Sequence, residues 1–97
     1  MGGEGRERTV RVRIAGRVQG VSYRYWTEDT ARGLGLTGWV RNRRDGSVEA
    51  LFSGAADEVA DMLQRCHDGP AAAVVSAVEI VAEGGDPPDR FEVLPTA

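Results

Sequence analysis

Apolar residues recur along this chain with two different periods, and the order in which the periods alternate leaves few folds open. Between Thr9 and Ala15 every second residue is apolar, which is typical of a strand with one buried face. From Tyr23 the period lengthens to that of a helix, and Gly35 suits the end of that helix. The expected buried positions of this helix are Trp26, Thr30, Ala31 and Leu34. The chain therefore begins with a predicted strand and helix.

The same pattern predicts three further strands and a second helix. Two strands, at residues 36–43 and 47–52, flank the hairpin signal Asp45-Gly46. A helix then begins near Ser53 and ends before Gly69-Pro70. Its expected apolar stripe consists of Ala56, Val59, Ala60, Leu63 and Cys66. A fourth strand is expected over residues 74–83, and a short fifth strand follows at residues 91–94.

This order, βαββαβ with an additional short strand, favours an α+β fold, the ferredoxin-like split sandwich. Both helices are expected on one face of an antiparallel sheet with strand order 4-1-3-2 plus the short C-terminal strand. The 97 residues contain no repeat and no interdomain linker. We therefore expect a single domain over residues 9–97, preceded by a flexible N-terminal extension of residues 1–8.

Composition excludes several classes of protein and site. The only cysteine, Cys66, cannot form an intramolecular disulfide, and a single histidine argues against a histidine-based metal site. No apolar run has the length of a membrane span, and no hydrophobic stretch follows Met1 as in a secretory signal. We therefore expect a cytoplasmic protein that does not enter membranes.

Charge is distributed unevenly along the chain. Ten of the twelve arginines lie in residues 1–44, which contain four acidic residues. The rest of the chain holds two arginines and eleven acidic residues, and lysine is absent. An arginine-rich first half is compatible with a protein that handles an anion, and also with the base composition of a genome.

The junction GRVQGVSYR, residues 16–24, has the chemistry of an anion-binding loop. Gly16 and Gly20 permit backbone angles that let consecutive amides point into one concavity. The helix that begins near Ser22 adds unpaired amides and the positive end of its dipole. The planar guanidinium of Arg24 matches phosphate oxygens. In the predicted strand order, Asn42 at the end of the second strand faces this loop from two strand spacings away, roughly 10 Å.

Two segments closely resemble the acylphosphatase family. They are GRVQGVSYR at residues 16–24 and GLTGWVRNRRDGSVE at residues 35–49, and the resemblance extends from about Thr9 to Leu94. It implies an enzyme that hydrolyses the carboxyl–phosphate bond of acyl phosphates to a carboxylate and inorganic phosphate, with no metal and no cofactor. It also implies that Arg24 and Asn42 are the catalytic residues. The implied phosphate-binding residues are Gly16, Arg17, Val18, Gln19, Gly20, Val21, Ser22 and Tyr23.

The residues themselves suggest how such a site works. Arg24 and the loop amides would stabilise the charge of the phosphoryl transition state, and Asn42 would orient a water molecule. The expected reaction is direct attack by that water, because no nucleophile is evident. Ser22, where the family varies, and Tyr23, where Phe is usual in the family, are minor departures.

Two other functions remain open at this point. A nucleic-acid-binding module shares the βαββαβ order, but it needs aromatic side chains on the open sheet face, where this chain offers Arg11, Arg13, Glu49 and Leu51. Cross-strand ion pairs with Glu79 and Glu83 account for those arginines without RNA. The second alternative is a non-catalytic domain that senses phosphate. We expect no nucleic-acid partner, a small-molecule acyl phosphate as substrate, and a monomer.

Overall fold

Strands and helices follow one another in the predicted order. The computed structural model describes residues 6–97. Its elements are β1 (Glu7–Arg17), α1 (Tyr23–Gly33), β2 (Thr37–Asn42), β3 (Val48–Ala55), α2 (Ala56–Cys66), β4 (Val74–Glu83) and β5 (Phe91–Val93). β1 begins two residues before its predicted start, and residues 1–5 of the expected extension lie outside the described residues.

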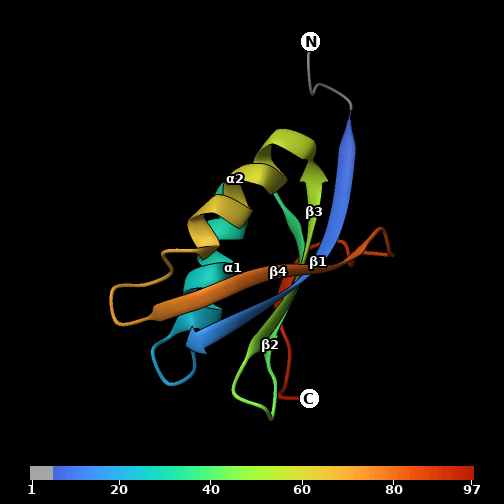
Figure 1. Cartoon of the computed structure of the whole chain (residues 1–97). Coiled ribbons are helices and arrows are strands. Elements are labelled where there is room, and N and C mark those ends of the chain that lie inside the picture. Colours follow the sequence, from blue (N-terminus) through green and yellow to red (C-terminus); the bar gives the residue numbers. More distant parts are fainter. Residues whose placement is uncertain (1–5) are drawn as a thin grey trace.

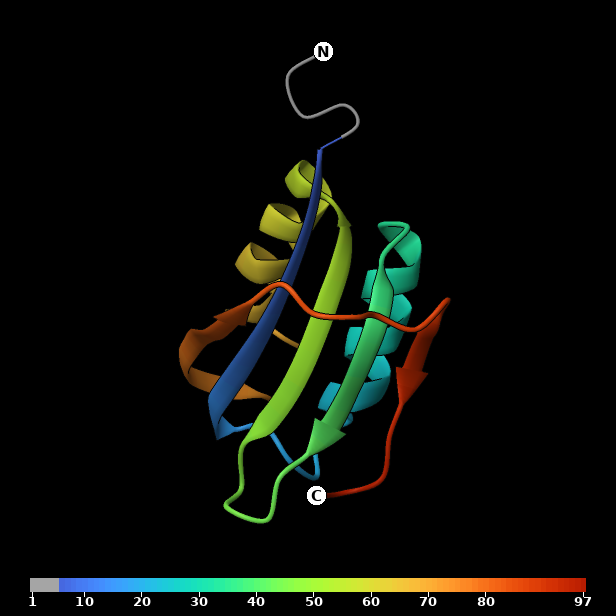
Figure 2. The same ribbon diagram turned by 90° about the vertical axis from the view of Figure 1, so that its right-hand side faces the viewer.

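The strands form one five-stranded sheet in the order β4-β1-β3-β2-β5, which confirms the ferredoxin-like prediction. Both helices pack against the same face of the sheet, and the other face is open (Figures 1 and 2). β1 and β2 each pair antiparallel with β3, which lies between them. β1 and β2 therefore run in the same direction, and their carboxyl ends lie at the same edge of the sheet.

The short fifth strand departs from the predicted antiparallel sheet. β5 pairs with β2 in parallel, so the sheet is mixed. Residues 84–90, between β4 at one edge and β5 at the other, run across the open face (Figure 2). The amide of Gly84 donates to the Thr9 carbonyl (2.7 Å), and the Arg90 carbonyl accepts from Gly38 (3.1 Å). This segment carries the chain from β4 at one edge of the sheet to the other edge, where β5 pairs with β2.

The core lies between the sheet and the helices. Val10, Val12 and Ile14 of β1 are fully buried, as their alternation predicts. The helix faces are partly different from the prediction. The fully buried side chains are Tyr23, Thr27 and Ala31 in α1, and Val59, Met62 and Cys66 in α2. None of the helices in residues 6–97 has the length and apolar character that crossing a membrane requires.

On the open face, one buried carboxylate joins three strands. Glu49 of β3 accepts hydrogen bonds from Arg11 (2.7 Å), Arg41 (2.8 Å) and Arg43 (3.1 Å), and we call these four residues the Glu49 cluster. Further pairs are Arg13 with Asp45 and Glu79, and Arg8 with Glu83. The predicted cross-strand pairing is therefore confirmed for Arg13 with Glu79, whereas Arg11 pairs with Glu49 and Glu83 pairs with Arg8.

Candidate active site

A short loop, residues 18–22, connects the end of β1 to α1. Gly20 has a φ of 73°, and Ser22 has a φ of 65° and a ψ of 26°, so both adopt the left-handed conformation that turns the chain sharply. The first main-chain hydrogen bond of the helix runs from the Trp26 amide to the Ser22 carbonyl (3.0 Å). The amides of residues 23–25 precede that bond and have no acceptor within the helix. They form the positive end of α1.

Gly16 and Arg17 belong to β1 rather than to this loop. They pair with Val75 and Val74 of β4, next to an irregularity in the register. Gly16 has a φ of 122°, and a Cβ built there would lie 2.3 Å from the Val74 carbonyl oxygen. The glycine therefore allows the close approach of β4 to the end of β1. In the structure, Gly16 thus contributes to the pairing of β1 with β4.

Asn42 is the last residue of β2, and the strand register fixes its position. It pairs with Val48 of β3, and Val48 pairs in turn with Ile14 of β1. Val40 is fully buried on the helix face, and side chains alternate along a strand. The Asn42 side chain is therefore on the helix face, on the same side of the sheet as α1.

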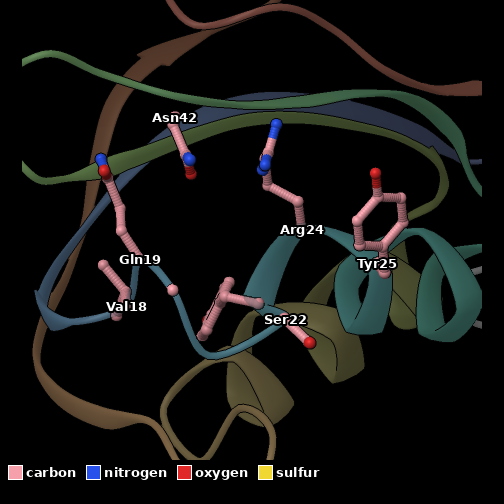
Figure 3. A pocket seen from close by; sticks show the side chains of 8 residues that line it. Val18, Gln19, Ser22, Arg24, Tyr25 and Asn42 are labelled. Atoms are coloured by element: carbon pink, nitrogen blue, oxygen red, sulfur yellow. The ribbon is translucent and has the colours of Figure 1, made fainter.

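The loop, the start of α1 and the end of β2 surround a cavity of about 290 Å³. Its lining residues are Val18, Gln19, Gly20, Ser22, Tyr23, Arg24, Tyr25 and Asn42. Figure 3 shows the side chains of Arg24 and Asn42 directed into the same space above the loop. The Ser22 hydroxyl points away from both of them. Within residues 6–97, no carboxylate lies within ion-pair distance of Arg24.

Seven of the ten site residues expected from the sequence line this cavity. The other three are Gly16, Arg17 and Val21. Sequence reasoning missed Tyr25, which lines the cavity beside Arg24 and is 61% exposed. The sequence does contain a feature that could have indicated this residue: Tyr25 is an aromatic residue in the first turn of the helix, and it does not fall on the apolar face.

Gln19 fastens the loop to the turn between β2 and β3. Its side-chain amide donates to the carbonyls of Arg43 (2.7 Å) and Ser47 (2.8 Å). The turn itself is stiffened by Asp45, which accepts from the Ser47 amide (2.9 Å) and hydroxyl (2.6 Å). These two bonds from Ser47 hold the pKa of the Asp45 carboxyl at about 2. Both protons of the Gln19 amide are thus used within the protein.

Tyr23 lines the cavity but is anchored in the core. Its hydroxyl donates to the carbonyl of Cys66 (2.7 Å), and the side chain is 1% exposed. Burial raises the pKa of the Tyr23 hydroxyl well above its usual value. Burial also raises the pKa of the Cys66 thiol to about 12, so this thiol stays protonated at neutral pH.

The arrangement has the features of an oxyanion site. A guanidinium, a carboxamide and the positive end of a helix converge on one small cavity, and this combination binds and polarises phosphate groups. The described residues contain no group of three or more His, Cys, Asp or Glu side chains that could hold a metal ion.

Comparison with known proteins identifies the family of the chain. The family model for acylphosphatases matches residues 10–93. The chain is 61% identical to the acylphosphatase of Nitrobacter hamburgensis over 89 residues, which cover 86% of this chain and 90% of that protein.

Solved structures show the same likeness. The acylphosphatase from Coxiella burnetii is 33% identical, with a TM-score of 0.82 over 94% of this chain and 96% of that one. The acylphosphatase from Bacillus subtilis is 30% identical, with a TM-score of 0.83 over 90% of this chain and 98% of that one. Sequence, fold and cavity thus agree, and the chain belongs to the acylphosphatase family.

Proposed function

We propose how this acylphosphatase, which hydrolyses the carboxyl–phosphate bond of acyl phosphates, uses its cavity. The phosphate group of the substrate binds to the amides of residues 18–23 and the first turn of α1. Arg24 contacts the phosphate oxygens through its planar fork. Asn42 holds a water molecule in line with the bond that breaks. The supporting observation is that one cavity is lined by Arg24, Asn42 and the start of α1.

In the proposed reaction, the water oxygen forms a bond to phosphorus while the bond from phosphorus to the acyl oxygen breaks. The acyl oxygen leaves as part of a carboxylate, which needs little protonation because a carboxylate is a good leaving group. The protons of the water remain on the inorganic phosphate. The negative charge at phosphorus is stabilised by Arg24 and by the amides, so the residues supply position and charge rather than a covalent intermediate.

The assignment of direct attack is supported by the lack of a suitably placed nucleophile in the described part of the chain. Ser22 has a hydroxyl near the loop, but Figure 3 shows it directed away from Arg24 and Asn42. The Tyr23 hydroxyl is engaged with the Cys66 carbonyl. Asn42 requires no pKa near neutrality to orient water, because its carboxamide accepts and donates hydrogen bonds without ionising.

Oxygen-18 labelling tests the mechanism. The purified chain is incubated with acetyl phosphate in labelled water without added metal, under single-turnover conditions. We expect the label in inorganic phosphate and none in acetate. Label in acetate would show attack at the carbonyl carbon, and a trapped phosphoserine at Ser22 would show a covalent intermediate. Either result would contradict direct attack at phosphorus.

We also propose that the enzyme acts as a cytoplasmic monomer. The cavity is lined by residues of one chain, so the proposed reaction needs no second copy. The one cysteine, Cys66, is free and buried, which is compatible with a reducing compartment. Light scattering after size exclusion should give the mass of a single chain at concentrations where acetyl phosphate is hydrolysed.

A further inference from the structure

Tyr25 is an exposed aromatic side chain at the edge of the cavity. Among the described residues, the large exposed hydrophobic side chains are Tyr25, Val74, Ile80 and Val81. Of these, Tyr25 alone lines the cavity that contains Arg24 and Asn42. Its side chain makes no contribution to the buried core, because it lies off the apolar face of α1. Its ring is therefore available to a ligand.

The in-line geometry of phosphoryl transfer determines where the acyl group must lie. The attacking and leaving oxygens are on opposite sides of phosphorus. If Asn42 holds the water, the acyl group points away from Asn42. Figure 3 shows Asn42 and Tyr25 on opposite sides of the Arg24 guanidinium. The acyl group then leaves on the side of Tyr25.

Arg24 also contributes to the position of the Tyr25 ring. Its guanidinium carbon lies 5.8 Å from the centre of the ring, within the range of a cation–π contact. The residue that binds the phosphate thus contacts the ring beside it. An aromatic face next to the leaving side of the phosphate offers an apolar surface to a flat acyl group.

We propose that Tyr25 forms the subsite for the acyl group and favours acyl phosphates with an aromatic or flat apolar acyl group. This inference rests on the proposed function, because it uses the roles of Arg24 and Asn42. Acetyl phosphate is too small to cover the ring, whereas benzoyl phosphate can stack on it. Tyr25 is therefore a determinant of specificity and is not required for breaking the bond.

The test compares benzoyl phosphate with acetyl phosphate for the wild type, Tyr25→Ala, Tyr25→Phe and the control Val81→Ala. Val81 is an exposed apolar residue of β4 that lines a different cavity, on the open face. We expect Tyr25→Ala to lower kcat/KM for benzoyl phosphate about 3- to 10-fold through a higher KM. Values for acetyl phosphate, and inhibition by inorganic phosphate, should stay unchanged. Tyr25→Phe and Val81→Ala should match the wild type.

Other outcomes separate the subsite from the proposed function. If Tyr25→Ala lowered kcat/KM equally for both substrates, Tyr25 would act through Arg24. If it lowered kcat/KM for neither, the acyl group would lie elsewhere. Either result would overturn the proposed subsite. If the wild type itself hydrolysed neither compound, the proposed function would fail instead. Tyr25→Gln serves as a second variant, and its thermal unfolding, like that of Tyr25→Ala, should match the wild type.

Discussion

Arg24 carries most of the charge that a phosphate would meet in the cavity. Arg24→Ala should abolish turnover and raise the inhibition constant for inorganic phosphate, since phosphate binding and transition-state stabilisation use the same guanidinium group. Arg24→Lys should fail nearly as badly, because an ammonium is a point charge. Steady-state kinetics and phosphate inhibition measure both effects.

A matched control for this prediction is Arg90→Ala. The Arg90 side chain is 80% exposed, next to the start of β5 and therefore at the opposite end of β2 from Asn42. The control should leave kcat, KM and phosphate inhibition at wild-type values. If the Arg24→Lys enzyme had nearly full activity, this would contradict the proposal that the guanidinium of Arg24 binds two phosphate oxygens at once.

Asn42 should affect the rate without affecting the affinity for phosphate. Asn42→Ala removes the group that orients water, so kcat should fall about 10²- to 10³-fold. The inhibition constant for inorganic phosphate should change little, because Arg24 and the loop amides remain. Equal damage to phosphate inhibition would mean that Asn42 is chiefly a phosphate ligand and would contradict the role assigned to it.

Single residues were predictable where a strand register or a turn dictates their position. Asn42 faces the loop because β1 and β2 end at one edge with β3 between them. Gly16 was expected in the cavity, but its close contact with β4 depends on a long-range pairing that no local pattern reveals. Tyr25 was missed for a related reason. Whether an exposed ring borders a cavity depends on elements distant in the sequence.

At the scale of elements, Gln19 links the loop to the β2–β3 turn that follows Asn42. Gln19→Leu leaves the carbonyls of Arg43 and Ser47 without this donor in a partly buried position. We expect a loss of about 1–3 kcal/mol in the free energy of unfolding. We also expect a higher inhibition constant for inorganic phosphate, because the loop is less constrained. Urea unfolding and phosphate inhibition measure the two effects.

A second substitution and a control sharpen this prediction. Gln19→Glu should destabilise the fold at neutral pH at least as much as Gln19→Leu, since a carboxylate would face two carbonyl oxygens. Gln64→Leu makes the same chemical change on the exposed side of α2 and should have little effect on either measurement. If both Gln19 variants were as stable as the wild type, the hydrogen bonds from Gln19 to the Arg43 and Ser47 carbonyls would not stabilise the fold.

The existence and order of the helices and strands could be predicted from the periodicity of apolar residues. Which residues each helix buries could not. Residues 59, 62 and 66 form the buried stripe of α2, although Ala60 had been expected in it and Met62 had not. Alanine contributes little apolar area and tolerates exposure, whereas Met62 lies three residues after Val59 and four before Cys66, on the same helix face. β5 was predicted as a strand, but its parallel pairing depends on a crossover that only the whole sheet defines.

For the whole molecule, the Glu49 cluster is the feature that connects β1, β2 and β3 by charge. The Glu49 side chain is 7% exposed, whereas those of its partners Arg11, Arg41 and Arg43 are 27–42% exposed. Burial by itself would raise the pKa of the Glu49 carboxyl. Hydrogen bonds from Arg11 and Arg41 and the charges of Arg41 and Arg43 outweigh burial, so the pKa is lowered.

A lowered pKa makes the contribution of Glu49 to stability depend on pH. In the unfolded chain a glutamate titrates near pH 4.3, and in the folded chain Glu49 titrates below its usual range. The stabilisation is therefore fully present above about pH 5 and is lost as the pH falls through the lowered pKa. Glu49→Gln should remove this pH-dependent part of the free energy of unfolding.

We expect Glu49→Gln to cost about 1–3 kcal/mol at pH 7, because it breaks charge-assisted hydrogen bonds to arginines that keep access to solvent. The difference from the wild type should shrink as the pH falls from 5 toward 3, which urea unfolding across this range measures. Glu79→Gln is the control: its side chain is 63% exposed and its nearest contact to Arg13 is 3.7 Å, so its effect should stay below about 0.5 kcal/mol. A Glu49→Gln deficit that stayed constant from pH 7 to pH 3 would mean that packing, rather than the charge of Glu49, holds the three strands together.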